Sequence, residues 1–392
     1  MYLLSDYSYN LPTDLIAQEA IHPHHDARMM VIDRDSGQIT AETTFWDIDT
    51  QLGEDRVIFF NDSRVVRSRV ALENTRYTRN DGTEHILTEG EIFYLETKTW
   101  NQFEALVRPG NKFKIGAIFM IGIYQIQVIG ITESGRLLEI VNPQVVNGKS
   151  RILDFLSTHG ALPLPPYIEY SAEKEVDYQT SFARTDGSVA APTASLHFTS
   201  ELVDKIENQK EYLTLHVWLG TFKGISTTDI RDYDIHREKI EIQLDIFQKI
   251  ATLKTTGKKI VAVGTTACRT LESLPYLWRE IKEDTKKSID ANTRKYWDNI
   301  TSMIEKQDWI HDITFNFAPS TLHFSTSIYI TPGYTFRVVD DLITNFHLSE
   351  SSLLVLVSAF LGYDEMMSIY EYAINKQYRF YSFGDGMYIR GK

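Results

Sequence analysis

The stretch Ile260-Val261-Ala262-Val263-Gly264-Thr265-Thr266-Ala267-Cys268-Arg269-Thr270-Leu271-Glu272 predicts a buried strand that turns directly into a helix. Four apolar residues lead to Gly264, and Thr265 or Thr266 suits the N-cap of the helix that follows. Such a turn presents free N–H groups at the carboxyl end of a strand, where ligands bind in α/β sheets. An anion site and a plain strand-to-helix cap explain this pattern equally well.

The rest of the chain repeats this alternation of strands and helices. Residues 212–220 and 327–330 have the composition of strands, and residues 353–360 are apolar almost all round, as in a buried helix. Residues 1–63 also mix short helices and strands. We therefore predict one layered α/β domain made of residues 1–63 and 150–392.

Residues 64–149 have a different, all-β character. Glycines separate short strand-like segments, at residues 91–95, 101–107, 117–121, 124–129 and 137–141. Five or more short strands at regular spacing are typical of a small barrel or sandwich. We predict a small antiparallel β-barrel domain inserted into the α/β domain.

Composition narrows the class of protein. The 392 residues are 43% hydrophobic and 24% charged, as in soluble globular proteins, and no apolar run approaches the roughly 18 residues that cross a bilayer. The first residues lack the pattern of a signal peptide. A single cysteine, Cys268, fits a reducing compartment, so we expect a cytoplasmic protein with no membrane partner. Inside a helix, Cys268 reads as a packed residue and not as a nucleophile.

The net charge of −13 argues against broad affinity for nucleic acid, which needs a positive surface. A local basic patch is compatible with it. Arg64, Arg67 and Arg69 follow one another closely, and they form either a solvated face or a phosphate-binding RNA contact.

A second stretch, Gly187-Ser188-Val189-Ala190-Ala191-Pro192-Thr193-Ala194-Ser195-Leu196-His197-Phe198-Thr199, is dense in small residues. Little side-chain volume lets a ligand or another backbone approach the main chain closely. Thr199 can cap the helix that follows. His197 is either a buried structural histidine or part of a ligand pocket.

Further polar clusters could carry acid–base chemistry. His236 and Glu238 are two residues apart and share one face of an extended chain, and a histidine with a carboxylate is a general-base arrangement. His216 lies near the end of a predicted strand, and Asn345, Phe346 and His347 precede the buried helix. Each cluster alone is weak evidence, because a lone histidine is usually structural.

Motifs for nucleotides and metals are absent: there is no Walker loop, GxGxxG, HExxH or zinc framework. His22, His24 and His25 lie close together beside Pro23, but no cysteine or carboxylate framework matches them. We expect a solvated loop there and no metal.

Taken together, the motifs resemble one family, the S-adenosylmethionine:tRNA ribosyltransferase-isomerases of queuosine biosynthesis. They follow the family's order over nearly the whole chain. They include Asn61-Asp62-Ser63-Arg64-Val65, residues 187–199, Leu215-His216-Val217, Gly220-Thr221-Phe222, His236 with Glu238, residues 262–273, Pro332-Gly333-Tyr334, Thr344-Asn345-Phe346-His347-Leu348, Tyr378-Arg379-Phe380 and Gly384-Asp385.

The resemblance implies that the α/β domain is catalytic. S-adenosylmethionine would be the ribosyl donor, as co-substrate and not as cofactor, and the acceptor would be the aminomethyl group of a 7-deazaguanine in tRNA. The products would be epoxyqueuosine-tRNA, adenine and methionine. This reaction requires a base for a ribose C5′ proton next to the sulfonium, an acid for the departing adenine, and an apolar pocket. It requires no metal, and we expect a monomer.

The resemblance also suggests roles for particular residues. The acid–base candidates are His197, His216, His236, Glu238 and His347, with their individual roles open. The substrate-binding candidates are Ser188, Thr193, Thr199, Gly220, Thr221, Phe222, Thr265, Thr266, Arg269, Asn345, Phe346 and Asp385. The RNA-binding candidates are Arg64, Arg67 and Arg69.

Some positions depart from the family pattern. Ser195 and Trp218 stand where such proteins usually carry glycine, Arg67 stands in place of a proline, and Glu91 lies where a lysine-containing motif is expected. Residues 276–310, which are charged and helix-prone, form a longer segment than the family predicts, and we expect it to have a largely solvated face. These departures leave two alternatives: a relative that uses S-adenosylmethionine on a different acceptor, and a non-catalytic RNA-binding relative.

Overall fold

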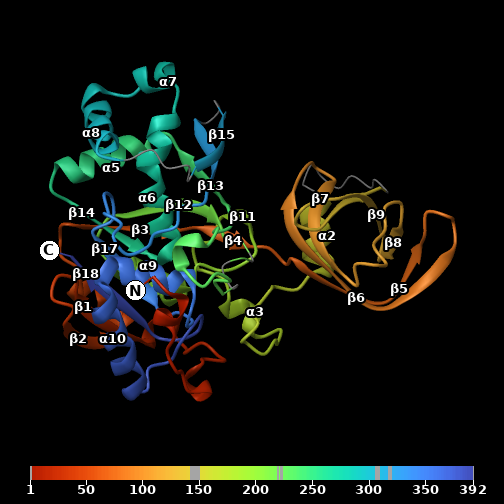
Figure 1. Ribbon diagram of the computed structural model, residues 1–392, viewed down its shortest axis with the longest axis horizontal. Coiled ribbons are helices and arrows are strands. Elements are labelled where there is room, and N and C mark those ends of the chain that lie inside the picture. The colour runs from red at the N-terminus through yellow and green to blue at the C-terminus, as the bar shows by residue number, and fades with distance from the viewer. Residues whose placement is uncertain are drawn as a thin grey trace.

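The computed structural model describes residues 2–141, 151–218, 220, 224–304, 310–316 and 320–391, with the backbone alone for 310–316. An α/β unit that holds both chain ends stands beside a β-barrel (Figure 1). The predicted fold class, a layered α/β unit with a small antiparallel barrel, is confirmed.

One ten-stranded sheet forms the centre of the α/β unit. In spatial order its strands are β15 (Ile310–Asn316), β16 (Thr321–Thr326), β13 (Glu238–Gln243), β12 (Lys210–His216), β3 (Arg56–Asn61), β14 (Lys259–Val263), β17 (Asp341–Asn345), β18 (Gly386–Arg390), β1 (Arg28–Asp33) and β2 (Ile39–Thr44). The four central strands, β12, β3, β14 and β17, run parallel, and pairs on both sides are mostly antiparallel. The carboxyl ends of the central strands therefore meet at one edge of the sheet.

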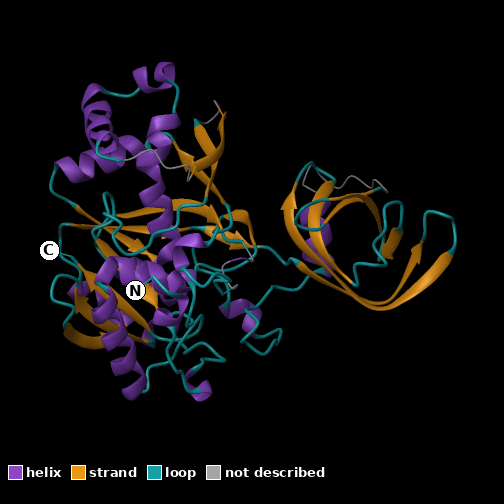
Figure 2. Ribbon diagram, viewed as in Figure 1, coloured by secondary structure: helices purple, strands orange, loops and turns teal. Residues whose placement is uncertain are grey.

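Helices cover both faces of this sheet (Figure 2). In β3, Val57 and Phe59 enter one hydrophobic cluster, while Ile58 and Phe60 enter the other, as the two-residue period of a strand requires. The larger cluster takes side chains from α5 (Ile246–Thr255), α6 (Gly264–Glu280), α8 (Ala291–Ser302), α9 (Ser352–Leu361) and α10 (Tyr363–Asn375). The smaller takes them from α1 (Ile48–Gln51) and α4 (Ser200–Lys205).

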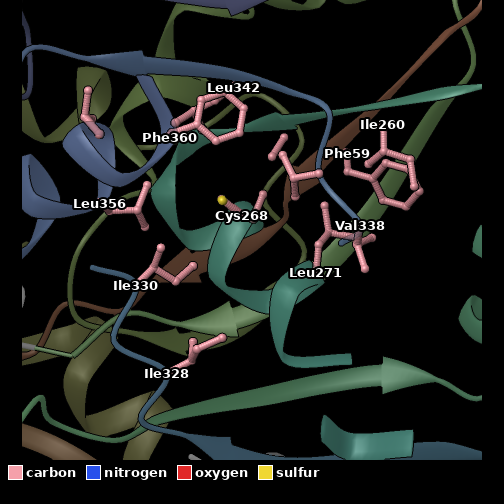
Figure 3. Close-up of a cluster of buried hydrophobic side chains, with 14 of the residues drawn as sticks. Phe59, Ile260, Cys268, Leu271, Ile328, Ile330, Val338, Leu342, Leu356 and Phe360 are labelled. Carbon is pink, nitrogen blue, oxygen red and sulfur yellow. The ribbon is translucent and has the colours of Figure 1, made fainter. Parts of the chain in front are cut away.

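Cys268 lies in the larger cluster, on α6, among side chains of β3, β14 and α9 (Figure 3). Its side chain is fully buried, and burial raises the pKa of the thiol well above its usual value. The prediction of a packed cysteine is confirmed.

The barrel is closed by six antiparallel strands. Around the barrel they are β10 (Arg136–Ile140), β7 (Gln102–Arg108), β6 (Glu84–Thr97), β5 (Arg69–Thr78), β8 (Ile118–Ile121) and β9 (Tyr124–Ile131). The helix α2 (Arg151–His159) follows, and its Ile152, Phe155 and Leu156 share the hydrophobic cluster of the barrel. The domain division after residues 63 and 149 stays a prediction.

Two short strands lie on the connections between the α/β unit and the barrel. β4 (Ser63–Val65) enters the barrel, and β11 (Thr185–Ser188) pairs with it in parallel. The short helix α3 (Lys174–Asp177) lies on the return path from α2 to β11.

Two local predictions are wrong. Residues 327–330 belong to no strand of the described sheet: Ile328 and Ile330 are buried in the core, and β16 ends just before them. The helix α6 begins at Gly264, with Val263 as the uncapped N-cap, so Thr265 and Thr266 lie inside its first turn. Gly264 has a φ of +86°, and this left-handed conformation, which favours glycine, makes the sharp turn.

The charged segment that includes α7 (Glu283–Lys287) and α8 has many exposed positions and also a buried aromatic side. Trp278 and Trp297 are fully buried against Phe247 of α5. Trp297 Nε1 donates to the Phe247 carbonyl oxygen at 2.8 Å. This segment therefore has a small aromatic core of its own.

Among the described ranges, no single helix has the length and apolar composition to span a membrane. Only α9 and α10 pass that test together, and they are bent by 114° at their junction.

Candidate active site

A small cavity of about 50 Å³ lies at the carboxyl edge of the central strands. It is walled by the end of β17, the first turn of α6 and the small-residue stretch of residues 187–199. Its lining includes Tyr167, Ala190, Ala191, Pro192, Thr193, Ala194, Val217, Gly264, Thr265, Thr266, Asn345, Phe346, His347, Leu353, Tyr381 and Ser382. Six of the predicted substrate-binding or catalytic residues thus meet in one place: Thr193, Thr265, Thr266, Asn345, Phe346 and His347.

The first turn of α6 gives this cavity its polar wall. Thr266 Oγ1 is buried and has no hydrogen-bond partner within the described part of the chain. The first N–H groups of a helix also lack partners within the helix. Together they form a donor-rich surface for a carboxylate or another small anion, as expected for the end of a parallel strand.

His197 supports this cavity from behind. Its Nε2 donates to Asn345 Oδ1 at 3.0 Å, and Asn345 Nδ2 donates in turn to the carbonyl oxygens of Tyr381 and Ser382. Phe45 stacks on the imidazole, with ring centroids 3.9 Å apart. Burial lowers the pKa of His197 to about 4, although the bond to Asn345 opposes the shift. His197 is therefore neutral, and it orients Asn345 without lining the cavity itself.

His347 does line the cavity. Its ring is buried, its Nε2 is 2.8 Å from Thr344 Oγ1, and burial lowers its pKa to about 3. It is therefore a neutral hydrogen-bonding group near pH 7.

A much larger cleft, of about 850 Å³, opens between the barrel and the α/β unit. Its barrel side includes Tyr94, Glu96, Lys98, Glu104, Glu133 and Leu153, and its α/β side includes Asp186, Gly187, His216, Val217, Trp218, Asp234, His236, Arg237, Lys239 and Glu241. Val217 lines both this cleft and the small cavity, so the two hollows adjoin. The stretch of residues 187–199 borders both.

His216 and Glu241 form one acid–base pair in the cleft. His216 Nε2 lies 3.2 Å from Glu241 Oε1, and this hydrogen bond lowers the pKa of the carboxyl. An ionised carboxylate only accepts, so Nε2 carries the proton and neutral His216 keeps its lone pair on Nδ1. Nδ1 has no partner in the described residues, and a Cβ added at Gly187 would lie only 2.8 Å from it. Glycine therefore keeps that side of the ring open.

His236, Glu238 and Arg269 form a second, more buried group. Glu238 Oε1 is 3.4 Å from His236 Nε2, and Glu238 Oε2 accepts from Arg269 Nη1. Burial raises the pKa of Glu238, but Arg269 and His236 outweigh it and bring the pKa to about 2. Arg269 Nε also donates to the Ile328 carbonyl oxygen at 3.2 Å. Arg269 thus holds Glu238 and does not line either hollow.

Three predicted substrate-binding residues make hydrogen bonds within the protein, and their contact with substrate stays a prediction. Ser188 Oγ donates to the Ala190 carbonyl oxygen at 2.8 Å. Thr199 caps α4, as predicted, by accepting from Leu202 N at 3.2 Å. Asp385 accepts from the backbone N–H groups of Arg28 and Arg379.

Gly220 lies against His236, because a Cβ there would be 2.4 Å from its Nδ1. Thr221 and Phe222 lie outside the described residues.

The predicted RNA-binding arginines all have protein partners. Arg64 donates to the Ala183 carbonyl oxygen at 2.7 Å, Arg67 pairs with Glu175 at 3.1 Å, and Arg69 pairs with Glu91 at 3.3 Å. The three side chains are roughly half exposed. Their contact with RNA stays a prediction.

The sequence alone did not point to Glu241. It shares a face with His216 only because β12 pairs with β13 in the register Thr214↔Glu241 and His216↔Lys239. No sequence spacing carries that signal, since it depends on the pairing of two strands that lie 25 residues apart in the chain.

Comparisons with known proteins point to one family. A family model described as queuosine biosynthesis protein matches residues 4–389. Two curated relatives are named S-adenosylmethionine:tRNA ribosyltransferase-isomerase. The one from Halothermothrix orenii is 37% identical over 98% of this chain and 99% of its own, and the one from Thermosynechococcus vestitus is 35% identical over 99% and 96%.

A solved structure of an S-adenosylmethionine tRNA ribosyltransferase from Thermotoga maritima is 26% identical. It covers 98% of this chain and 100% of its own, with a TM-score of 0.48. The family match and the two curated relatives extend over nearly the whole chain. The chain therefore belongs to the S-adenosylmethionine:tRNA ribosyltransferase-isomerase family of queuosine biosynthesis.

Proposed function

We propose that this protein transfers and isomerises the ribosyl group of S-adenosylmethionine onto the aminomethyl-7-deazaguanine of a tRNA, with release of adenine and methionine. The observation that carries the proposal is the acid–base cleft that adjoins the donor-rich cavity at the sheet edge. No feature of the described chain favours either alternative, a different acceptor or a non-catalytic RNA-binding role.

The charge of the cleft suits these substrates. The sulfonium of the donor and the aminomethyl group of the acceptor are both cationic. Among the described residues that line the cleft, six are acidic and three are lysine or arginine. This excess of carboxylates favours cationic groups over the phosphates of tRNA, which we place outside the cleft.

His216 is the proposed base. Glu241 fixes its tautomer, so Nδ1 is free to take a C5′ proton from the carbon next to the sulfonium. The imidazolium that forms is then stabilised by the Glu241 carboxylate, as in other carboxylate–histidine pairs.

His236, held beside ionised Glu238, is the proposed acid for the departing adenine. Trp218 and Val217 supply apolar surface between the two histidines and the small cavity. Thr265, Thr266 and the first turn of α6 are proposed to bind the carboxylate of the methionine moiety, and Asn345 to orient a ribose hydroxyl. In this proposal protein side chains perform each acid–base step. The monomeric state and the cytoplasmic location of the protein remain predictions.

The test is an assay of the purified full-length protein with S-adenosylmethionine and tRNA that bears the aminomethyl-7-deazaguanine. We expect one adenine released per modified nucleoside, with the adenine measured by chromatography and the nucleoside by mass spectrometry. The same tRNA with unmodified guanine, which lacks the amine, is the control. Binding of S-adenosylmethionine without release of its adenine in the presence of either tRNA would contradict the proposal.

A further inference from the structure

We propose that His22, His24 and Asp177 form a binding site for a divalent transition-metal ion, with Zn²⁺ as the probe. The three side chains offer ligand atoms that all lie within 4.8 Å of one another. His22 Nε2 is 3.3 Å from Asp177 Oδ2, and His24 Nε2 is 3.1 Å from Asp177 Oδ1. The histidines come from the loop at the η3 turn (His24–Asp26), and the carboxylate comes from the last residue of α3.

The orientation of His24 is the first argument. Its Nδ1 lies 3.0 Å from the Leu196 carbonyl oxygen, which can only accept, so Nδ1 carries a proton. Nε2 is therefore the nitrogen that faces the Asp177 carboxylate, 3.1 Å from Oδ1. In the neutral ring this nitrogen offers its lone pair to a cation bound there, whereas in the protonated ring it would donate to Oδ1. A backbone carbonyl that fixes the far nitrogen is also the usual support of a metal-bound histidine.

The spacing is the second argument. In a tetrahedral zinc site with bonds of about 2.0 Å, neighbouring ligand atoms are about 3.3 Å apart. The distances from His24 Nε2 to Asp177 Oδ1 and from His22 Nε2 to Asp177 Oδ2, 3.1 and 3.3 Å, are close to that value, so each histidine faces its own oxygen of the carboxylate. Imidazole and carboxylate ligands suit zinc and its neighbours in the transition series. His22 is 65% exposed, so an ion can enter from solvent and keep water as its fourth ligand.

His25 does not belong to this site, because its Nδ1 hydrogen-bonds Thr199 Oγ1 at 2.7 Å. The expectation that the histidine loop holds no metal is thereby revised: the missing carboxylate comes from Asp177, about 150 residues away in the chain. An ion bound here would link the N-terminal loop to α3, which lies on the connection from the barrel to β11. It would also fix the Leu196 carbonyl next to His197, which orients Asn345.

The test uses the full chain after dialysis against a chelator. Calorimetric titration with Zn²⁺ should give one site per chain with micromolar or tighter affinity. Asp177→Asn, which keeps the shape but removes the charge, and His24→Ala should each weaken binding at least 100-fold. The matched control is His85→Ala, because His85 lies on β6 away from the cluster and should leave binding unchanged.

Nitrogen NMR of the histidine rings separates this site from a plain ion pair. With a metal site, added Zn²⁺ should shift the Nε2 signals of both His22 and His24 while the Nδ1 proton of His24 remains. A His24 ring that is doubly protonated at pH 7 and unaffected by Zn²⁺ would overturn the proposal. So would Zn²⁺ binding that persists at full strength in both cluster variants.

Discussion

At the scale of single residues, His216 and Glu241 carry the catalytic proposal. His216→Ala removes the proposed base, and we expect adenine release to fall about 10²–10⁴-fold, the usual contribution of general-base catalysis. Glu241→Gln should cost less, because His216 remains but can adopt the wrong tautomer. Steady-state assays of both variants measure the rate of adenine release.

Neither change should unfold the chain, since His216 lies at the cleft and not in the core. Circular dichroism and thermal unfolding serve as the control. Full activity of His216→Ala would remove this residue from the mechanism and leave His236 as the candidate base.

The burial of His197 predicts how the stability of the protein depends on pH. Its folded-state pKa is about 4, below the value near 6.5 of an unfolded histidine, because burial disfavours the charged ring. The stability that it contributes is complete above about pH 6.5 and is lost as the pH falls towards 4. Between pH 7 and pH 5 the free energy of unfolding should drop by about 2 kcal/mol on this account.

Urea unfolding at the two pH values measures this drop. His197→Gln keeps a donor for Asn345 but does not titrate, so this part of the pH dependence should vanish. His347, with a pKa of about 3, contributes in the same direction and keeps part of the slope in the variant. An unchanged slope in His197→Gln would mean that the ring has the same pKa in the folded and unfolded protein.

At the scale of elements, the bond between Arg269 and Glu238 joins α6 to β13. Arg269→Met leaves a buried carboxylate without its cation, and we expect a loss of about 3–5 kcal/mol in the free energy of unfolding at pH 7. The double variant with Glu238→Gln should recover most of it. Urea unfolding of the two single variants and the double variant gives the coupling. Additive losses would show that the two groups act independently.

The elements also show what the sequence could predict. The strand and helix of residues 260–272 were predictable, because an apolar run and a glycine turn are local signals. β5 was not predicted, because its buried Val70 and Leu72 are separated by exposed positions and no continuous apolar run marks the strand. The prediction of a strand at residues 327–330 is wrong. An apolar composition indicates that a segment is buried, but it does not indicate whether a neighbouring strand is available for pairing.

For the site, the sequence could identify the polar residues but not their partners. Asn345, Phe346 and His347 are adjacent in sequence and meet the first turn of α6 as predicted for a sheet edge. Pairs such as His216 with Glu241, and the cluster of His22, His24 and Asp177, depend on strand register and on the path of long loops. Such tertiary contacts leave no pattern in one sequence.

At the scale of the whole molecule, the barrel and the α/β unit share the cleft, and Trp218 bridges them. Its indole packs against the hydrophobic cluster of the barrel while its backbone N–H lies 3.4 Å from Glu238 Oε1. Trp218→Ala should loosen this contact and raise the KM for tRNA about tenfold, a change of about 1.4 kcal/mol. Steady-state kinetics with varied tRNA measure it. A lower Tm with an unchanged KM would assign Trp218 a purely structural role.

The burial of Cys268 has a practical consequence for studying that cleft. Because the only thiol of the chain is sealed in the core and held in its protonated form, thiol-reactive dyes should leave the native protein unlabelled. A cysteine introduced on the exposed rim of the barrel and another on the α/β unit would then carry a fluorophore pair in an otherwise unaltered background. The change in energy transfer on addition of tRNA would report directly whether the two units close on their substrate.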